Sequence, residues 1–123
     1  MLDAADQWHA RCATAWHELA DRCLTTEAVV TEASHLVARG GAAAALPLEF
    51  LLAVGVPIVA LEPSGHEHAV RLLNRYVDTP MDYADATLVV VADALKLGTV
   101  LTTDRRGFRA YRRANGAAFV VRP

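Results

Sequence analysis

The chain has 123 residues, of which 54% are hydrophobic and 21% charged, and its formal net charge is −2. This length fits one domain of ordinary size, and this composition excludes intrinsic disorder, which requires low hydrophobicity and high net charge. The near-zero charge excludes a global positive field that would hold nucleic acid, so such binding would need a local patch or bound metal ions.

The two cysteines do not predict a disulfide scaffold. Cys12 and Cys23 fall in one expected helix, roughly 16 Å apart at 1.5 Å per residue, which is beyond the reach of a disulfide. Free thiols are typical of a reducing cytoplasm, where we expect this protein. The most apolar stretch, residues 42–61, is interrupted by Glu49 and two prolines, so we expect no membrane span.

Apolar residues that recur every three or four positions predict helices, and short continuous apolar runs predict buried strands. The expected helices cover residues 6–22, 27–39, 43–54, 64–77 and 82–97, with a short turn or helix over 108–113. The expected strands cover residues 24–26, 58–61, 99–103 and 119–121. This alternation predicts an α/β fold in one domain, residues 1–123, with a parallel sheet flanked by helices on both faces. The helix over 82–97 is apolar on all sides in its middle, so we expect it at the centre.

Acidic residues lie where the expected strands end, which is where open α/β sheets bind ligands. Asp104 directly follows the strand over 99–103, and Asp85 lies in the first helical turn beside Asp82. Glu32 borders the apolar stripe of its helix, where a carboxylate costs free energy unless it is paired or bound to metal. Grouped carboxylates suit Mg²⁺ or Mn²⁺, which can activate water and hold a phosphodiester. The pattern therefore predicts a metal-dependent nuclease.

Each carboxylate also has a purely structural interpretation. Asp82 is a plausible helix N-cap with Asp85 as its partner three residues on. Asp104 is a plausible first residue of a turn. These interpretations stay open at the level of sequence.

Basic residues are concentrated near the carboxyl terminus. Half of the twelve lie between residues 105 and 122, and all six are arginine. Arg105, Arg106 and Arg109 follow Asp104 closely, so they predict either a solvated charged face or a track for RNA phosphates, which arginine binds bidentately.

Three segments carry a resemblance: Thr26 with Glu32, residues 76–86 with their Asp85-Ala86 pair, and residues 100–108 with Thr102 and Asp104. Together they resemble the PIN domain family, and within it the VapC-like toxins of bacterial toxin–antitoxin pairs. The resemblance implies an endoribonuclease that uses Mg²⁺, is neutralised by a small antitoxin protein and is usually dimeric. It points to Glu32, Asp85 and Asp104 as the acidic site, with Thr102 as the hydroxyl beside it.

One departure from the family concerns its first strand, which ends in an aspartate that binds metal. Residues 2–6 resemble the helix after that strand, so we expect a sheet that lacks the strand, with a vacancy between residues 24–26 and 100–103. We also expect little or no ribonuclease activity from the chain as it stands. Asp3 is a poor stand-in, since a helix start is its more ordinary role. The alternatives are a true start upstream of Met1 and a decayed toxin.

Three functions therefore compete at the level of sequence. The first is a ribonuclease, and the second is a catalytically inactive, truncated PIN domain that only binds an antitoxin. The third is a phosphoacceptor receiver domain, which needs an aspartate at the end of a middle strand. Because Glu62-Pro63 follows the strand over 58–61, this third function ranks last.

Overall fold

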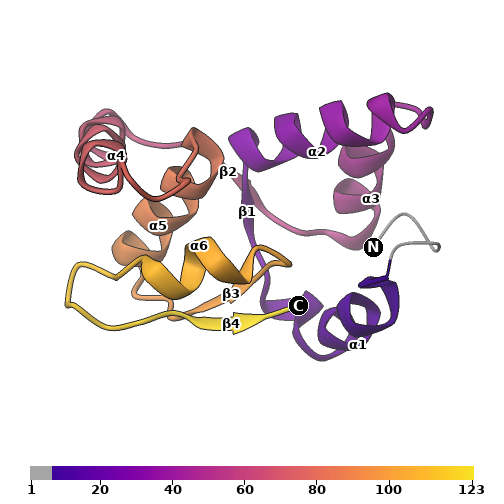
Figure 1. Cartoon of the computed structure of the whole chain (residues 1–123). Coiled ribbons are helices and arrows are strands. Elements are labelled where there is room, and N and C mark those ends of the chain that lie inside the picture. The colour runs from indigo at the N-terminus through magenta and orange to yellow at the C-terminus, as the bar shows by residue number, and fades with distance from the viewer. Residues whose placement is uncertain (1–6) are drawn as a thin grey trace.

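The computed structural model describes residues 7–123, in which helices alternate with short strands (Figure 1). The helices are α1 (His9–Leu19), the 3₁₀ helix η1 (Ala20–Arg22), α2 (Glu27–Arg39), α3 (Leu46–Val54), α4 (Pro63–Arg75), α5 (Tyr83–Leu95) and α6 (Arg105–Ala110). The strands are β1 (Thr25–Thr26), β2 (Ile58–Val59), β3 (Thr99–Leu101) and β4 (Val120–Arg122). The predicted order is confirmed, and the largest shift is in the last helix, predicted over 108–113.

The strands are parallel, as predicted, but they form two separate pairs. Strand β1 pairs with β2, with Thr25 opposite Ile58, and β3 pairs with β4, with Thr99 opposite Val120. Within the described residues, β1 and β3 are not paired. The predicted vacancy between residues 24–26 and 100–103 is therefore present, and Asp3 lies outside the described residues.

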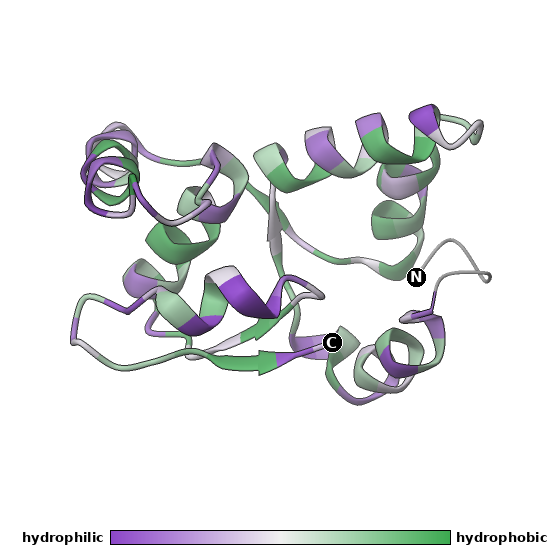
Figure 2. Ribbon diagram, viewed as in Figure 1, coloured by the Kyte–Doolittle hydropathy of each residue, from purple (hydrophilic) through white to green (hydrophobic). Residues whose placement is uncertain are grey.

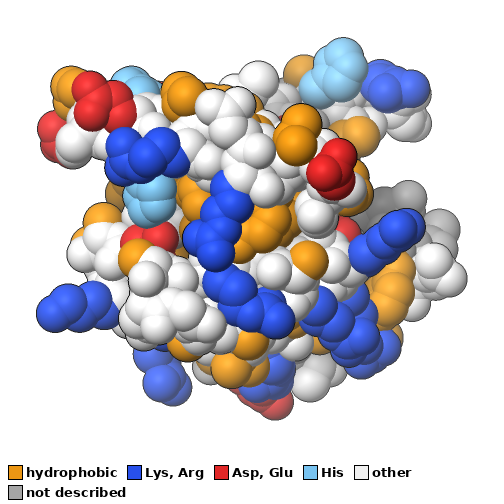
Figure 3. Space-filling model, turned by 60° about the vertical axis from the view of Figure 1, so that its left-hand side comes forward, with side chains coloured by type: hydrophobic (Ala, Val, Ile, Leu, Met, Phe, Trp, Pro, Cys, Tyr) orange, Lys and Arg blue, Asp and Glu red, His pale blue; other side chains and the backbone are white. Residues whose placement is uncertain are grey.

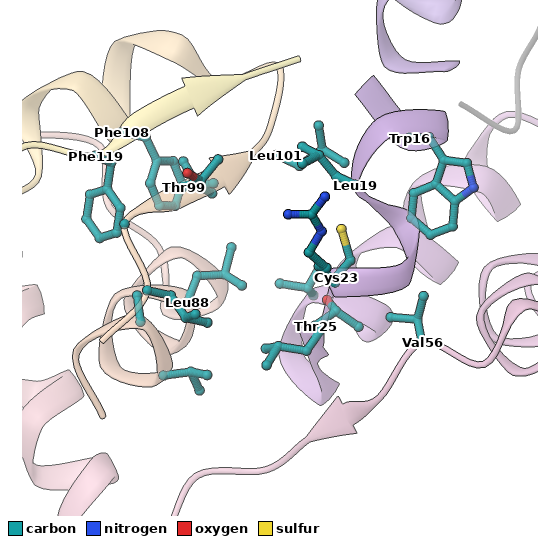
Figure 4. Close-up of a pocket in the computed structure, with 18 of the residues that line it drawn as sticks. Trp16, Leu19, Cys23, Thr25, Val56, Leu88, Thr99, Leu101, Phe108 and Phe119 are labelled. Atoms are coloured by element: carbon teal, nitrogen blue, oxygen red, sulfur yellow. The ribbon is translucent and has the colours of Figure 1, made fainter. Parts of the chain in front are cut away.

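A cavity of about 460 Å³ lies between the two strand pairs. Figure 4 shows it between the side chains of α1 and η1 on one side and those of α5 and β3 on the other. The Gly98 carbonyl and the Thr102 N–H both bond to residues around β4, at 2.8 and 2.7 Å. Because backbone groups alternate along a strand, those of Thr99 and Leu101 point away from β4. The vacancy is thus bordered by an open strand edge and apolar side chains.

Helix α5 lies at the centre of the fold, as its apolar middle predicts. Its buried residues are Ala84, Ala86, Thr87, Val89, Val90, Val91 and Ala92, and Figure 2 shows it as largely hydrophobic. Figure 1 places α4 on one side of β1 and α2 with α3 on the other. Helix α5 contacts α4, α2 and β1. It is therefore the element that joins the two sides of the molecule.

The main core belongs to the carboxyl-terminal part of the chain. Its ten buried residues come from α4, α5, β3, α6 and the segments that flank α6 and β4: Ala69, Leu72, Ala86, Val89, Val90, Ala92, Val100, Phe108, Tyr111 and Phe119. The Phe108 ring packs edge-on against the rings of Tyr111 and Phe119, at 5.1 and 5.8 Å between centroids. This aromatic cluster holds α6 against the core. Among the described helices, none is long and apolar enough to cross a membrane.

Candidate active site

The first turn of α5 carries two of the predicted carboxylates. The Asp85 N–H donates to Asp82 Oδ1 at 2.8 Å, and the Asp82 N–H donates to Asp85 Oδ2 at 3.2 Å. This reciprocal capping box satisfies backbone donors that a helix start leaves unpaired. The structural interpretation of both residues is therefore correct, and the same two bonds fix where their carboxylates lie.

Asp104 is placed at the start of α6, just after β3. Its Oδ1 accepts from the Gly107 N–H at 3.1 Å, which makes Asp104 the N-cap of α6. This cap explains why the helix begins at Arg105, three residues earlier than predicted. The Asp104 N–H in turn donates to Thr102 Oγ1 at 3.0 Å. Thr102 thus lies beside the acidic residue, and its hydroxyl holds the Asp104 backbone.

Glu32 lies in the second turn of α2, and here the structure corrects the sequence analysis. We expected Glu32 to border a buried stripe, but Glu32 is exposed and α2 contains no fully buried residue. The apolar positions of α2 are only half-buried because the helix packs beside α3 and α5 rather than inside the main core. The position of the Glu32 carboxylate is therefore set by the elements that pack against α2, and not by burial of Glu32 itself.

Two buried threonines bring α2 to α5. Thr87 Oγ1 donates to the Ala84 carbonyl at 2.7 Å and lies 2.7 Å from Thr26 Oγ1. Because the single hydroxyl proton of Thr87 goes to Ala84, Thr26 is the donor between the two hydroxyls. Thr26 Oγ1 also accepts from the Val29 N–H at 3.4 Å and so caps α2. This link brings the helix that carries Glu32 to the helix start that carries Asp82.

The carboxylates affect one another's ionisation. Burial raises the pKa of Asp85 to about 6, and repulsion from Asp82 and Asp104 adds to the rise, while the hydrogen bond from the Asp82 backbone opposes it. Although Glu32 is largely exposed, its partial burial raises its pKa, with further contributions from the charge of Asp82 and a hydrogen bond to it. For both carboxylates, burial is the largest cause of the rise.

Helix α6 places the predicted arginines directly after Asp104. Arg106 and Arg109 are exposed, and within the described chain neither they nor Arg105 form an ion pair with a carboxylate. The Arg105 guanidinium instead lies over the Trp8 ring, 5.5 Å from its centroid. Figure 3 shows lysine and arginine side chains in a band across one face of the molecule. The exposed Arg106 and Arg109 therefore lie in the helix that Asp104 caps.

Comparison with known proteins identifies the family of the chain. Residues 2–114 match the PIN domain family. The chain belongs to this family. It is also 37% identical over 124 residues to Ribonuclease VapC26 of Mycobacterium tuberculosis, an alignment that covers 99% of this chain and 92% of that protein. The chain is therefore a VapC-like PIN domain, as the three sequence segments predicted.

The residues of this PIN domain suit a hard divalent cation by their chemistry. Glu32, Asp82, Asp85 and Asp104 supply only oxygen atoms, and none of the ion pairs in the described chain involves them. Burial is the main cause of the raised pKa values of Asp85 and Glu32, and the charge of Asp82 adds to both, which a cation would offset. Within residues 7–123, however, no three Asp, Glu, His or Cys side chains already form a metal site. The donor set fits Mg²⁺ or Mn²⁺, with closer approach needed on binding.

Two residues that contact the elements carrying the carboxylates were missed by the sequence analysis. Thr87 lies in an otherwise apolar run of α5. A buried hydroxyl costs free energy unless it is hydrogen-bonded, and this was the only sign in the sequence that Thr87 has a polar partner. Tyr111 lies far along the chain from the carboxylates, yet its hydroxyl reaches Asp85 Oδ2 at 3.4 Å. Burial first, then Asp85 and Asp104, raises the pKa of Tyr111, so its hydroxyl stays protonated at neutral pH.

Proposed function

We propose that this PIN domain is a metal-dependent endoribonuclease that cleaves phosphodiester bonds in RNA. The observation that carries the proposal is the group of four carboxylates, Glu32, Asp82, Asp85 and Asp104, beside exposed arginines and with no neutralising ion pair. The relative named Ribonuclease VapC26 supports the same class of activity. The cofactor is Mg²⁺, with Mn²⁺ as a substitute, since both prefer carboxylate and phosphate oxygens.

The residues of this chain divide the work by position. Asp85 and Asp104, anchored at the starts of α5 and α6, would hold the metal with Glu32, and Asp82 and Thr102 complete the polar surroundings. A bound divalent cation would supply phosphate coordination and lower the pKa of water. Arg105, Arg106 and Arg109 bind the phosphates of the RNA on either side of the cleaved bond.

The partners follow from the same family assignment. We propose that a cognate antitoxin protein binds and neutralises this chain, that two copies form a homodimer, and that the protein works in the cytoplasm. The alternative function is an inactive PIN domain that binds only the antitoxin. The cavity between β1 and β3 favours this alternative, because within residues 7–123 no strand pairs with both β1 and β3.

RNA cleavage with Mg²⁺ and with EDTA tests the proposal. The 123-residue chain, called the printed chain below, is compared with an extended version that carries an added amino-terminal apolar strand ending in aspartate. We expect little cleavage from the printed chain and EDTA-sensitive cleavage from the extended version, since ångström-scale misplacement of reacting groups costs about 100-fold in rate. In the extended version, Asp85→Asn should lower cleavage by about 100-fold or more.

Asp78→Asn is the matched control, because Asp78 is an exposed aspartate in the segment before α5 and is not among the charges that shift the pKa values of Asp85 and Glu32. It should leave cleavage unchanged. Cleavage that survives EDTA or Asp85→Asn would contradict the metal-dependent mechanism. A folded extended version that binds an antitoxin but cleaves no RNA would instead favour the inactive alternative. Strong, EDTA-sensitive cleavage by the printed chain would show that the added strand is not required.

A further inference from the structure

The hydroxyl of Tyr111 lies next to the carboxylate group and has no role in the proposed function. Tyr111 follows α6 and is fully buried, with 0% of its surface exposed. Its ring is fixed edge-on against Phe108 and Tyr76, with 5.1 Å between centroids in both pairs. These contacts fix the position of the ring, and they therefore also fix where its hydroxyl lies.

The hydroxyl lies against the segment that carries the α5 carboxylates. Tyr111 Oη donates to the Pro80 carbonyl at 2.8 Å and lies 3.4 Å from Asp85 Oδ2. Pro80 is two residues before Asp82, the N-cap of α5. One hydroxyl thus holds the backbone that leads into the capping box and also touches the carboxylate at its third position.

The same hydroxyl lies close to Asp104, on the other side of the site. A Cβ atom placed on Gly107 would lie 2.6 Å from Asp104 Oδ2 and 2.9 Å from Tyr111 Oη. Both oxygens therefore crowd the same point above the Gly107 backbone, and only glycine leaves room for them. Tyr111 is the neutral group at which the Asp85 side and the Asp104 side of the site meet.

We propose that Tyr111 is a positioning residue for a divalent cation, because its bond to the Pro80 carbonyl ties the segment that leads into the Asp85 capping box to the end of α6, the helix that Asp104 starts. This inference rests on the proposed function and adds a residue to it. Carboxylates without a cation repel one another, and this tie limits how far the starts of α5 and α6 separate. Groups that orient metal ligands in this way typically contribute 10- to 100-fold to metal affinity.

The test is the affinity of the printed chain for Mn²⁺ alone, measured by titration calorimetry, together with its thermal unfolding. Tyr111→Phe keeps the ring and removes the hydroxyl, and it should weaken Mn²⁺ binding by about 10-fold. Tyr76→Phe is the matched control, because Tyr76 Oη accepts from the Arg112 N–H at 2.9 Å in the same aromatic cluster. It should lower the melting temperature comparably and leave Mn²⁺ affinity within two-fold.

Gly107→Ala tests the same geometry without removing the hydroxyl. The new methyl must displace either Asp104 or Tyr111, so Mn²⁺ affinity should again fall. Wild-type binding that Tyr111→Phe leaves unchanged would overturn the inference and leave the proposed function intact. Equal losses of affinity in Tyr111→Phe and Tyr76→Phe would also overturn it, since the role would then be merely structural. No Mn²⁺ binding by the wild-type chain would overturn the inference alone, because EDTA-sensitive cleavage by the extended version decides the metal-dependent function separately.

Discussion

The carboxyl-terminal part of this PIN domain, from α4 to β4, is packed very differently from its amino-terminal helices α1 to α3. All ten residues of the main core come from the carboxyl-terminal part. Helix α2 contains no fully buried residue, and Leu36 and Leu52 on the amino-terminal side are 57% and 67% exposed. The cavity between β1 and β3 lies where the two parts meet. Asp85 and Asp104 therefore rest on a firm scaffold, whereas Glu32 is carried by a loosely packed helix.

Because the two parts are packed so differently, the rigidity of the acidic site depends on the link between them. Strand β1 contacts α5, and the Thr26–Thr87 hydrogen bond joins them directly at 2.7 Å. Within the described residues, β1 receives no support from β3. Local stability in proteins follows the density of buried apolar contacts, so the Glu32 side should open more readily than the Asp85 side.

We expect the greatest difference in the free energy of unfolding between a variant of a core residue and a variant of an exposed residue. Phe108 is 1% exposed, so Phe108→Ala should lower the free energy of unfolding by about 3–5 kcal/mol. Leu52→Ala should change it by no more than about 0.5 kcal/mol, because that side chain is mostly in solvent. Urea denaturation followed by circular dichroism measures both. Similar losses in the two variants would show that the amino-terminal helices are packed as firmly as the core.

Much of this contrast was not predictable from the sequence, although the elements were. Apolar periodicity is a local property, and it located α2 and α5 well. Whether an apolar stripe is buried depends on what packs against it, which is why Glu32 was expected beside a buried surface and is exposed. The vacancy followed from the family resemblance. The Tyr111–Pro80 contact joins residues 31 positions apart, and no local pattern signals such a bond.

A smaller effect is expected at the link between the two parts. Thr87→Val keeps the shape of the side chain and removes the partner of the buried Thr26 hydroxyl, which should cost about 1–3 kcal/mol. The loss should appear as faster hydrogen exchange in α2 than in the aromatic cluster around Phe108. Thr31→Val is the control, since Thr31 is exposed and its hydroxyl bonds only to the Glu27 carbonyl within α2. Uniform acceleration across the chain would contradict a local link.

A smaller change in stability is expected from the ionisation of Asp85, which lies on the well-packed side of the site. The ordinary pKa of Asp85 is 3.8, and in the folded chain it rises to about 6. Between these values the folded state binds more protons at Asp85 than the unfolded state, so this residue's contribution to stability falls as pH rises from about 4 to 6. Because Asp85 is only half-buried, solvent screening reduces the loss to about 1 kcal/mol.

Asp85→Asn removes this titration and keeps a side-chain oxygen in the capping box. The stability of the variant relative to the wild-type chain should therefore improve by about 1 kcal/mol between pH 4 and pH 7. Denaturation of both proteins across that range, without added metal, measures the difference and cancels the titration of other carboxylates. Added Mn²⁺ should raise the wild-type melting temperature more at pH 7 than at pH 5, because an ionised Asp85 is the better ligand. A difference between the two proteins that does not change with pH would show that Asp85 ionises normally, and that its carboxylate is less buried and farther from its acidic neighbours than the structure indicates.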